Sequence, residues 1–268
     1  MTLPIYLNEF DPFAADWLRN LMAAGEIPNG VIDARDIRNV QPADIVGRFR
    51  QCHFFSGIAG WPLALKLAGW PDDRECWSGS CPCQPFSVAG KRRGQADERH
   101  LWPEFFRLIR ECHPATVFGE QVPGAIGHGW WDEVAADLEA EGYACGAVVL
   151  GAHSVGAPHI RQRIYWVASD TNDHHGDGWG GTLQVRGQRS AEAAHGNLRQ
   201  EGSEWATEPR PVAVAYGVPN RLGRLNGFGN AIVPQVAAEF IRAFLAPTCP
   251  ELSKNQSLKV FRPANAGI

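Results

Sequence analysis

The stretch from Cys52 to Gly60 reads as an apolar strand that runs directly into a glycine loop, and Pro62 then opens a helix that ends at Gly69. Glycines at such a bend let the backbone approach a ligand, and the N-terminus of the following helix favours negative charge. Strands alternate with helices over most of the chain. The sequence therefore predicts an α/β fold with a ligand site at the carboxyl ends of its strands.

Acidic residues lie within or shortly after three of the predicted strands. Glu9 ends a strand over residues 4–10, and Asp36 lies in a second strand candidate over residues 31–40. Between them, Asp11 and Pro12 are typical of a helix start. A carboxylate after one strand can accept from both ribose hydroxyls of an adenosine, and one after the next can accept from the adenine amino group. Glu120 follows an apolar strand over residues 115–118, where α/β sheets place their ligands.

One cysteine stands in a loop of small residues, where it gains little as core packing. Cys83 lies between Pro82 and Gln84, and arginines and a lysine follow within sixteen residues. Nearby cations can lower a thiol pKa, so Cys83 is a candidate nucleophile. Cys81 makes a zinc or redox pair conceivable, but paired zinc ligands are usually two to four residues apart and need a second pair. We predict no metal site.

The composition is that of an ordinary globular protein, with 44% apolar and 20% charged residues and a net charge of −4. The first ten residues have neither a basic end nor an apolar block, so we expect no export. Seven cysteines without a pattern fit a reducing cytoplasm, and we expect a cytoplasmic monomer. The charge gives no sign of nucleic-acid binding, so a nucleic-acid contact by a chain with this balance would need locally gathered arginines.

Five short motifs resemble those of the DNA (cytosine-5) methyltransferase family. They are Phe55-x-Gly57-x-x-Gly60, Pro82-Cys83-Gln84-x-Phe86-Ser87, Glu120-Gln121-Val122, His159-x-Arg161-x-Arg163 and Gly229-Asn230-Ala231 followed by Val233-Pro234. Two positions depart from the family pattern, since Gln121 replaces an asparagine and His159 a glutamine. The longer amide of Gln121 leaves the local hydrogen bonding of its loop an open question.

This resemblance implies a Rossmann-like fold with a mostly parallel sheet and S-adenosyl-L-methionine as the cofactor. It implies a catalytic domain over residues 1–169 and 226–250, a small target-recognition region over 170–225 and a tail over 251–268. Its catalytic residues would be Cys83, Glu120, Arg161 and Arg163. The cofactor-binding residues would be Phe55, Gly57, Ile58, Gly60, Glu9, Phe10, Asp36, Ile37, Pro82, Leu101, Asn230 and Ala231. Gln84 and Ser87 would support the substrate.

The order of the motifs differs from the usual family arrangement. The ribose and adenine residues usually lie between the glycine loop and the cysteine loop, but here they precede both. We interpret the chain as a permuted member, which requires Glu9 to lie beside the strand that ends at Gly57. The alternative is that Asp72 or Glu75 serves the ribose.

The function implied is methyl transfer to C5 of a cytosine flipped out of duplex DNA, with a covalent cysteine adduct. A cognate restriction endonuclease is a candidate partner. Two alternatives remain at this point: a tRNA cytosine methyltransferase with the same catalytic set, and an inactive DNA-binding relic.

Overall fold

The computed structural model describes residues 3–82, 101–172 and 229–246. Its centre is a seven-stranded sheet with the order β2-β1-β3-β4-β5-β7-β6. The strands are β1 (Leu3–Asn8), β2 (Gly30–Asp33), β3 (Phe49–Phe54), β4 (Cys76–Gly79), β5 (Thr116–Gln121), β6 (Tyr143–Gly151) and β7 (Gln162–Asp170). The first five run parallel, and β7 pairs antiparallel with both β5 and β6. The mostly parallel α/β sheet predicted from the sequence is confirmed.

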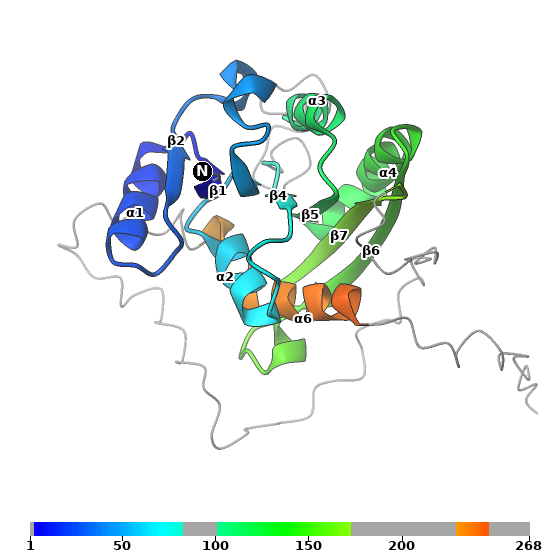
Figure 1. The fold of residues 1–268 in the computed structure, drawn as a ribbon. Helices are drawn as coiled ribbons and strands as arrows, with labels where there is room; N and C mark the ends of the chain where they lie inside the picture. Colours follow the sequence, from blue (N-terminus) through cyan, green and yellow to red (C-terminus); the bar gives the residue numbers. More distant parts are fainter. Residues whose placement is uncertain (1–2, 83–100, 173–228, 247–268) are drawn as a thin grey trace, which may run out of the picture.

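Helices cover both faces of the sheet (Figure 1). They are α1 (Pro12–Ala23), α2 (Gly60–Ala68), α3 (Trp102–Cys112), α4 (Trp130–Ala140) and α6 (Pro234–Leu245). The short 3-10 helices η1 (Ile37–Asn39) and η2 (Pro42–Asp44) connect β2 to β3, and η4 (Pro123–His128) and η5 (Ala152–Val155) follow β5 and β6. None of the described helices is long and apolar enough to cross a membrane.

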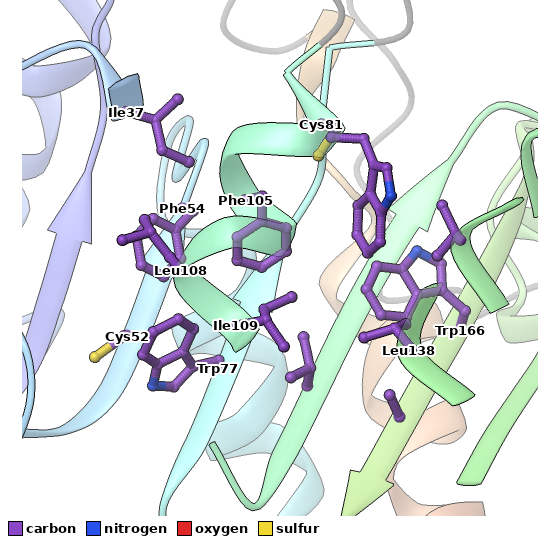
Figure 2. Packing of buried hydrophobic residues seen from close by; sticks show 14 of the residues in the cluster. Ile37, Cys52, Phe54, Trp77, Cys81, Phe105, Leu108, Ile109, Leu138 and Trp166 are labelled. Carbon is purple, nitrogen blue, oxygen red and sulfur yellow. The ribbon is translucent and has the colours of Figure 1, made fainter. Parts of the chain in front are cut away.

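The largest core lies between the sheet and the helices α3 and α4. Figure 2 shows Phe105 and Leu108 of α3 packed near Phe54 and Trp77 of the sheet. Cys81 is 7% exposed and belongs to this same cluster. The beginning of the cysteine loop is therefore built into the core.

The opposite face packs against α1, α2 and α6. The helices α2 and α6 lie side by side there and bury Trp61, Ile241 and Phe240 against Phe118 and its neighbours. One polar pair lies inside this face of the sheet, where Nδ1 of His53 is 2.8 Å from Oγ of Ser78. Both side chains are fully buried, and burial lowers the pKa of His53 to about 3.

The helix boundaries follow from local chemistry. Asp11 caps α1 by accepting from the backbone N–H of Ala14 at 2.9 Å, and Pro12 occupies the first turn, as predicted. Gly69 ends α2 in the left-handed conformation, with φ of 76°. The second strand is shorter than predicted, since β2 stops at Asp33 and Asp36 instead caps η1. That turn carries the chain across β1 to the far side, where β3 begins.

Candidate active site

Hydrogen bonds to main-chain carbonyls connect the carboxyl ends of β1, β2 and β3. The N–H of Glu9 donates to the carbonyl of Asp33 at 3.0 Å, and both the N–H and the hydroxyl of Ser56 donate to the carbonyl of Asn8 at 3.1 Å. Ligands of parallel sheets bind at this edge. The predicted cofactor residues of three separate segments therefore reach one place.

Glu9 contacts the glycine loop directly. Its Oε2 accepts from the N–H of Gly57 at 2.7 Å, and its Oε1 accepts from the N–H of Asp11 at 2.8 Å. Burial raises the pKa of the Glu9 carboxyl, and the two backbone hydrogen bonds oppose that rise. The prediction that Glu9 lies beside the strand ending at Gly57 is confirmed. Asp72 and Glu75 precede β4, so they lie at the amino edge of the parallel strands, away from this loop.

The glycine loop leaves room for a ligand on one side and none on the other. Gly57 has φ of 55°, and a Cβ atom there would meet no heavy atom of the described residues within 4 Å. A Cβ on Gly60, in contrast, would lie 2.6 Å from Cγ1 of Ile232. Phe55 and Ala59 are left-handed as well, with φ of 52° and 69°. Backbone strain of this kind concentrates at ligand sites.

The predicted adenine contacts differ in their exposure. Phe10 is 67% exposed beside Glu9, so its ring is free to cover a ligand. Asp36 is partly exposed and accepts from the N–H of Arg38 at 2.9 Å as the cap of η1. The Ile37 side chain, at 2% exposure, packs into the main core. Any adenine contact by Ile37 therefore uses its backbone or requires the side chain to move.

Four further predicted cofactor residues surround this edge. Ile58 is partly exposed in the glycine loop, and Leu101 precedes α3 and packs against the main core. Pro82 and Asn230 are exposed. Their contacts with a cofactor stay predictions.

Glu120 is a buried acid rather than an exposed loop residue. It is the penultimate residue of β5 and is 7% exposed, and its Oε1 lies 2.8 Å from Nε of Arg163. Burial raises the pKa of Glu120 to about 7, although Arg163 and then Arg161 hold it down. Because β7 runs antiparallel to β5, the arginines before and at its start meet the acid at the end of β5. A carboxyl with a pKa near neutrality can hold or release a proton at little cost.

The strand that carries Glu120 is pressed closely against β7. A Cβ on Gly119 would lie 2.0 Å from the indole of Trp166, so only glycine fits there. The residue after the acid also has a structural contact. Nε2 of Gln121 donates to the carbonyl of Cys81 at 3.2 Å, and its Oε1 accepts from the N–H of Val122 at 3.0 Å. The longer amide thus ties the start of the cysteine loop to the acid's strand.

Arg161 reaches a different element from Arg163. Its Nη2 donates to the carbonyl of Gly229 at 2.9 Å and to that of Ala231 at 2.5 Å. These carbonyls belong to the segment before α6, which was predicted to lie near the cofactor. The three other residues predicted for catalysis or substrate support, Cys83, Gln84 and Ser87, lie outside the described residues.

The sequence analysis did not predict a polar network that lies at the carboxyl ends of β1 and β2. Oδ2 of Asp33 accepts from the Tyr6 hydroxyl at 2.7 Å. The Arg35 guanidinium donates to both carboxylate oxygens of Asp33. Nδ2 of Asn8 donates to the carbonyls of Asp33 and Arg35. No motif marks these residues; only their positions at the ends of adjacent strands do.

Comparison with known proteins connects this geometry to a family. Residues 64–189 match the C-5 cytosine-specific DNA methylase family model. The type II methyltransferase M.HhaI of Haemophilus parahaemolyticus is 36% identical over 167 residues, which cover 61% of this chain and 41% of that protein. M.NgoMIV of Neisseria gonorrhoeae is 33% identical over 100 residues, which cover 36% of this chain and 32% of that protein.

The chain therefore spans less than half of the length of these curated relatives. A solved structure of a Spodoptera frugiperda DNMT2 mutant aligns at a TM-score of 0.44 and 17% identity, covering 68% of this chain and 45% of that one. The fold is established by the sheet itself and not by that likeness. Residues 64–189, which include Glu120, Arg161 and Arg163, are therefore similar to the C-5 cytosine-specific DNA methylase family, in agreement with the motifs that resemble those of this family.

Proposed function

We propose that the chain methylates C5 of cytosine in duplex DNA with S-adenosyl-L-methionine as the methyl donor. The observation that carries the proposal is the buried Glu120, 2.8 Å from Arg163 at the edge of the sheet where the glycine loop also lies. An acid and a guanidinium can together hold the polar edge of a cytosine. In this role Glu120 faces ring N3 and the amino group, and Arg163 faces the base carbonyl.

The residues at the carboxyl edge fit the cofactor. Glu9 already uses one lone pair of each carboxylate oxygen on a backbone N–H, which orients the group and leaves acceptor capacity for two ribose hydroxyls. The space beside Gly57 is open among the residues that the structure describes and can admit the ligand, and the exposed Phe10 ring can cover adenine. When bound, the cofactor supplies an electrophilic methyl group on a sulfonium.

The chemistry required of the chain is activation of C5, because cytosine C5 is a poor nucleophile. The Cys83 thiolate forms a bond to C6, which places enamine character on C5, and protonated Glu120 donates its proton toward N3, where negative charge develops. After C5 has gained its methyl group, its proton passes to solvent, the electron pair of the C5–H bond re-forms the C5–C6 double bond, and Cys83 leaves C6 as a thiolate. The base must leave the stack first, and Gln84 and Ser87 would support the emptied helix.

Expression of the chain in cells without cytosine-5 methylation tests this proposal. Bisulfite sequencing of the DNA should show methylcytosine in one sequence context, and the Cys83→Ser variant should show none. Duplex DNA with 5-fluorocytosine in that context should form a covalent complex, because fluorine blocks the proton loss that frees the cysteine. Methylation of tRNA but not of DNA by the purified chain would refute the substrate assignment.

Two further parts of the proposal concern target recognition and a partner. The target-recognition region over residues 170–225, of which 173–225 lie outside the described residues, would read the DNA sequence. A cognate endonuclease would cut the same sequence when it is unmethylated, which fits the type II naming of the relatives.

A further inference from the structure

Among the predicted catalytic residues that the structure describes, Arg161 has side-chain contacts with the main chain of a distant segment. A guanidinium that serves a DNA phosphate or a flipped base has to present its donors to the ligand. Here Nη2 of Arg161 donates to two main-chain carbonyls, those of Gly229 and Ala231, about seventy residues further along the chain. Arg161 itself is left-handed, with φ of 28°, at a place where a non-glycine residue pays in backbone strain.

The segment that Arg161 binds lies on the cofactor loop. Ile232 and Val233 are buried, and Ile232 fills the space beside Gly60 so closely that no Cβ could be accommodated there. A second side chain of β7 holds the same segment, since the backbone of Val233 hydrogen-bonds the Tyr165 hydroxyl. Tyr165 of β7 lies opposite Glu120 of the neighbouring strand β5. The start of β7 therefore holds residues 229–233 at two points.

We infer that Arg161 is a positioning residue that fastens residues 229–233 onto the glycine loop, and that its main contribution is to cofactor binding rather than to DNA contact. This inference rests on the proposed function, because it assigns the glycine loop to S-adenosyl-L-methionine. Charged donors on neutral carbonyls make stronger hydrogen bonds than neutral donors do, and two on one side chain fix direction as well as distance. Without them, Ile232 is held against Gly60 by packing and by the contact of Tyr165 with Val233.

The same arrangement links the cofactor end of the site to its base end. Arg161 is two residues from Arg163, the partner of Glu120, and both guanidinium groups favour the charged form of that acid. A displaced Arg161 therefore changes two things: the support of the cofactor loop and the field at Glu120. The first change should appear in cofactor binding, and the second in the pH dependence of turnover.

The test compares Arg161→Gln, Arg161→Lys and Tyr165→Phe with the parent chain and with Arg110→Gln, an exposed arginine on α3. Calorimetry with S-adenosyl-L-methionine measures cofactor affinity without DNA, and fluorescence anisotropy with a labelled target duplex at several salt concentrations measures DNA affinity. We expect Arg161→Gln to weaken cofactor binding roughly tenfold or more, the scale of a lost charged hydrogen bond. Because Arg161→Lys can still donate to one carbonyl, its cofactor affinity should fall between those of the parent and of Arg161→Gln.

The kinetic pattern provides the second readout. The KM for the cofactor should rise in Arg161→Gln more than kcat falls, and the salt dependence of DNA binding should match that of the parent and of Arg110→Gln. Tyr165→Phe, which loses only the contact with Val233, should change cofactor affinity in the same direction but less. If Arg161→Gln does not fold, the lysine and phenylalanine variants decide the question by the same two measurements.

The inference is overturned if Arg161→Gln binds the cofactor as the parent does, and DNA binding weakens instead with a salt slope smaller by about 1, the mark of a lost phosphate contact. Failure of the proposed function looks different. In that case the parent chain itself would not bind S-adenosyl-L-methionine, whatever residue stands at position 161.

Discussion

Replacement of Glu9 tests the reading of the site most sharply. The carboxylate accepts from the backbone N–H groups of Gly57 and Asp11, and in the proposed complex it also accepts from the ribose. Glu9→Ala should weaken binding of S-adenosyl-L-methionine by about 1–3 kcal/mol, the usual loss when a buried hydrogen-bonding group is removed from its partners. By mass-action arithmetic this corresponds to roughly a 5- to 150-fold rise in Kd.

The effect on folding should be smaller than the effect on binding. Gly57 is partly exposed and Asp11 is exposed, so water can replace the lost carboxylate on both N–H groups. We expect about 1 kcal/mol of lost stability in Glu9→Ala, near the net value of an ordinary hydrogen bond. Glu9→Gln keeps one acceptor oxygen and the size of the side chain, so its cofactor affinity should fall between those of the parent and of Glu9→Ala.

Calorimetry with purified, folded variants measures these affinities, and thermal unfolding reports stability in parallel. Asp72→Asn and Glu75→Gln are the matched controls, because these acids precede β4 at the opposite edge of the parallel strands. Both controls should bind the cofactor as the parent does. An unchanged Kd in Glu9→Ala, with a loss in either control, would refute the reasoning and with it the permuted order of the motifs.

Four further outcomes are expected. Cys83→Ser should abolish methyl transfer while Cys81→Ser keeps most of it, because burial raises the pKa of the Cys81 thiol and makes it a poor nucleophile; trapping with 5-fluorocytosine DNA shows which sulfur reacts. Glu120→Gln should lower turnover roughly a hundredfold. Since the pKa of Glu120 is raised to about 7, its protonated form is present below that pH and lost above it, so kcat/KM of the parent should fall as pH rises through 7; a flat profile would contradict a protonated acid. Gly119→Ala should destabilise the fold by about 1–3 kcal/mol in chemical unfolding, the range for overpacked sites, because its Cβ would lie 2.0 Å from Trp166.

Much of the fold could be predicted because its signals are local. The cap formed by Asp11 and Pro12 marks α1, and a glycine loop after an apolar strand marks the turn into α2. The adjacency of Glu9 and Gly57 could also be predicted, but only through the motif resemblance. The side-chain pattern alone does not say which strand lies beside which.

The contacts that cross between elements could not be predicted. Gln121 was an open question in the sequence, because whether a longer amide finds a partner depends on where the carbonyl of Cys81 lies. Arg161 and Arg163 lie two residues apart and suggest a shared target, yet the left-handed backbone at Arg161 sends its side chain to residues 229 and 231. Whether such side-chain contacts form depends on the distance between segments that are far apart in the sequence.

The buried pair of His53 and Ser78 sets a limit on the acidity that the fold withstands. Burial keeps the pKa of His53 near 3 in the folded chain, whereas an unfolded histidine takes up its proton near pH 6.5. Below about pH 6.5 the unfolded chain therefore holds a proton that the folded chain excludes, and the free energy of unfolding falls by about 1.4 kcal/mol per pH unit until about pH 3. His53 lies on β3, the strand that leads into the glycine loop. Mild acid therefore lowers the free energy of unfolding through a residue of the strand that supports the loop. This loss begins before exposed carboxylates are neutralised near pH 4.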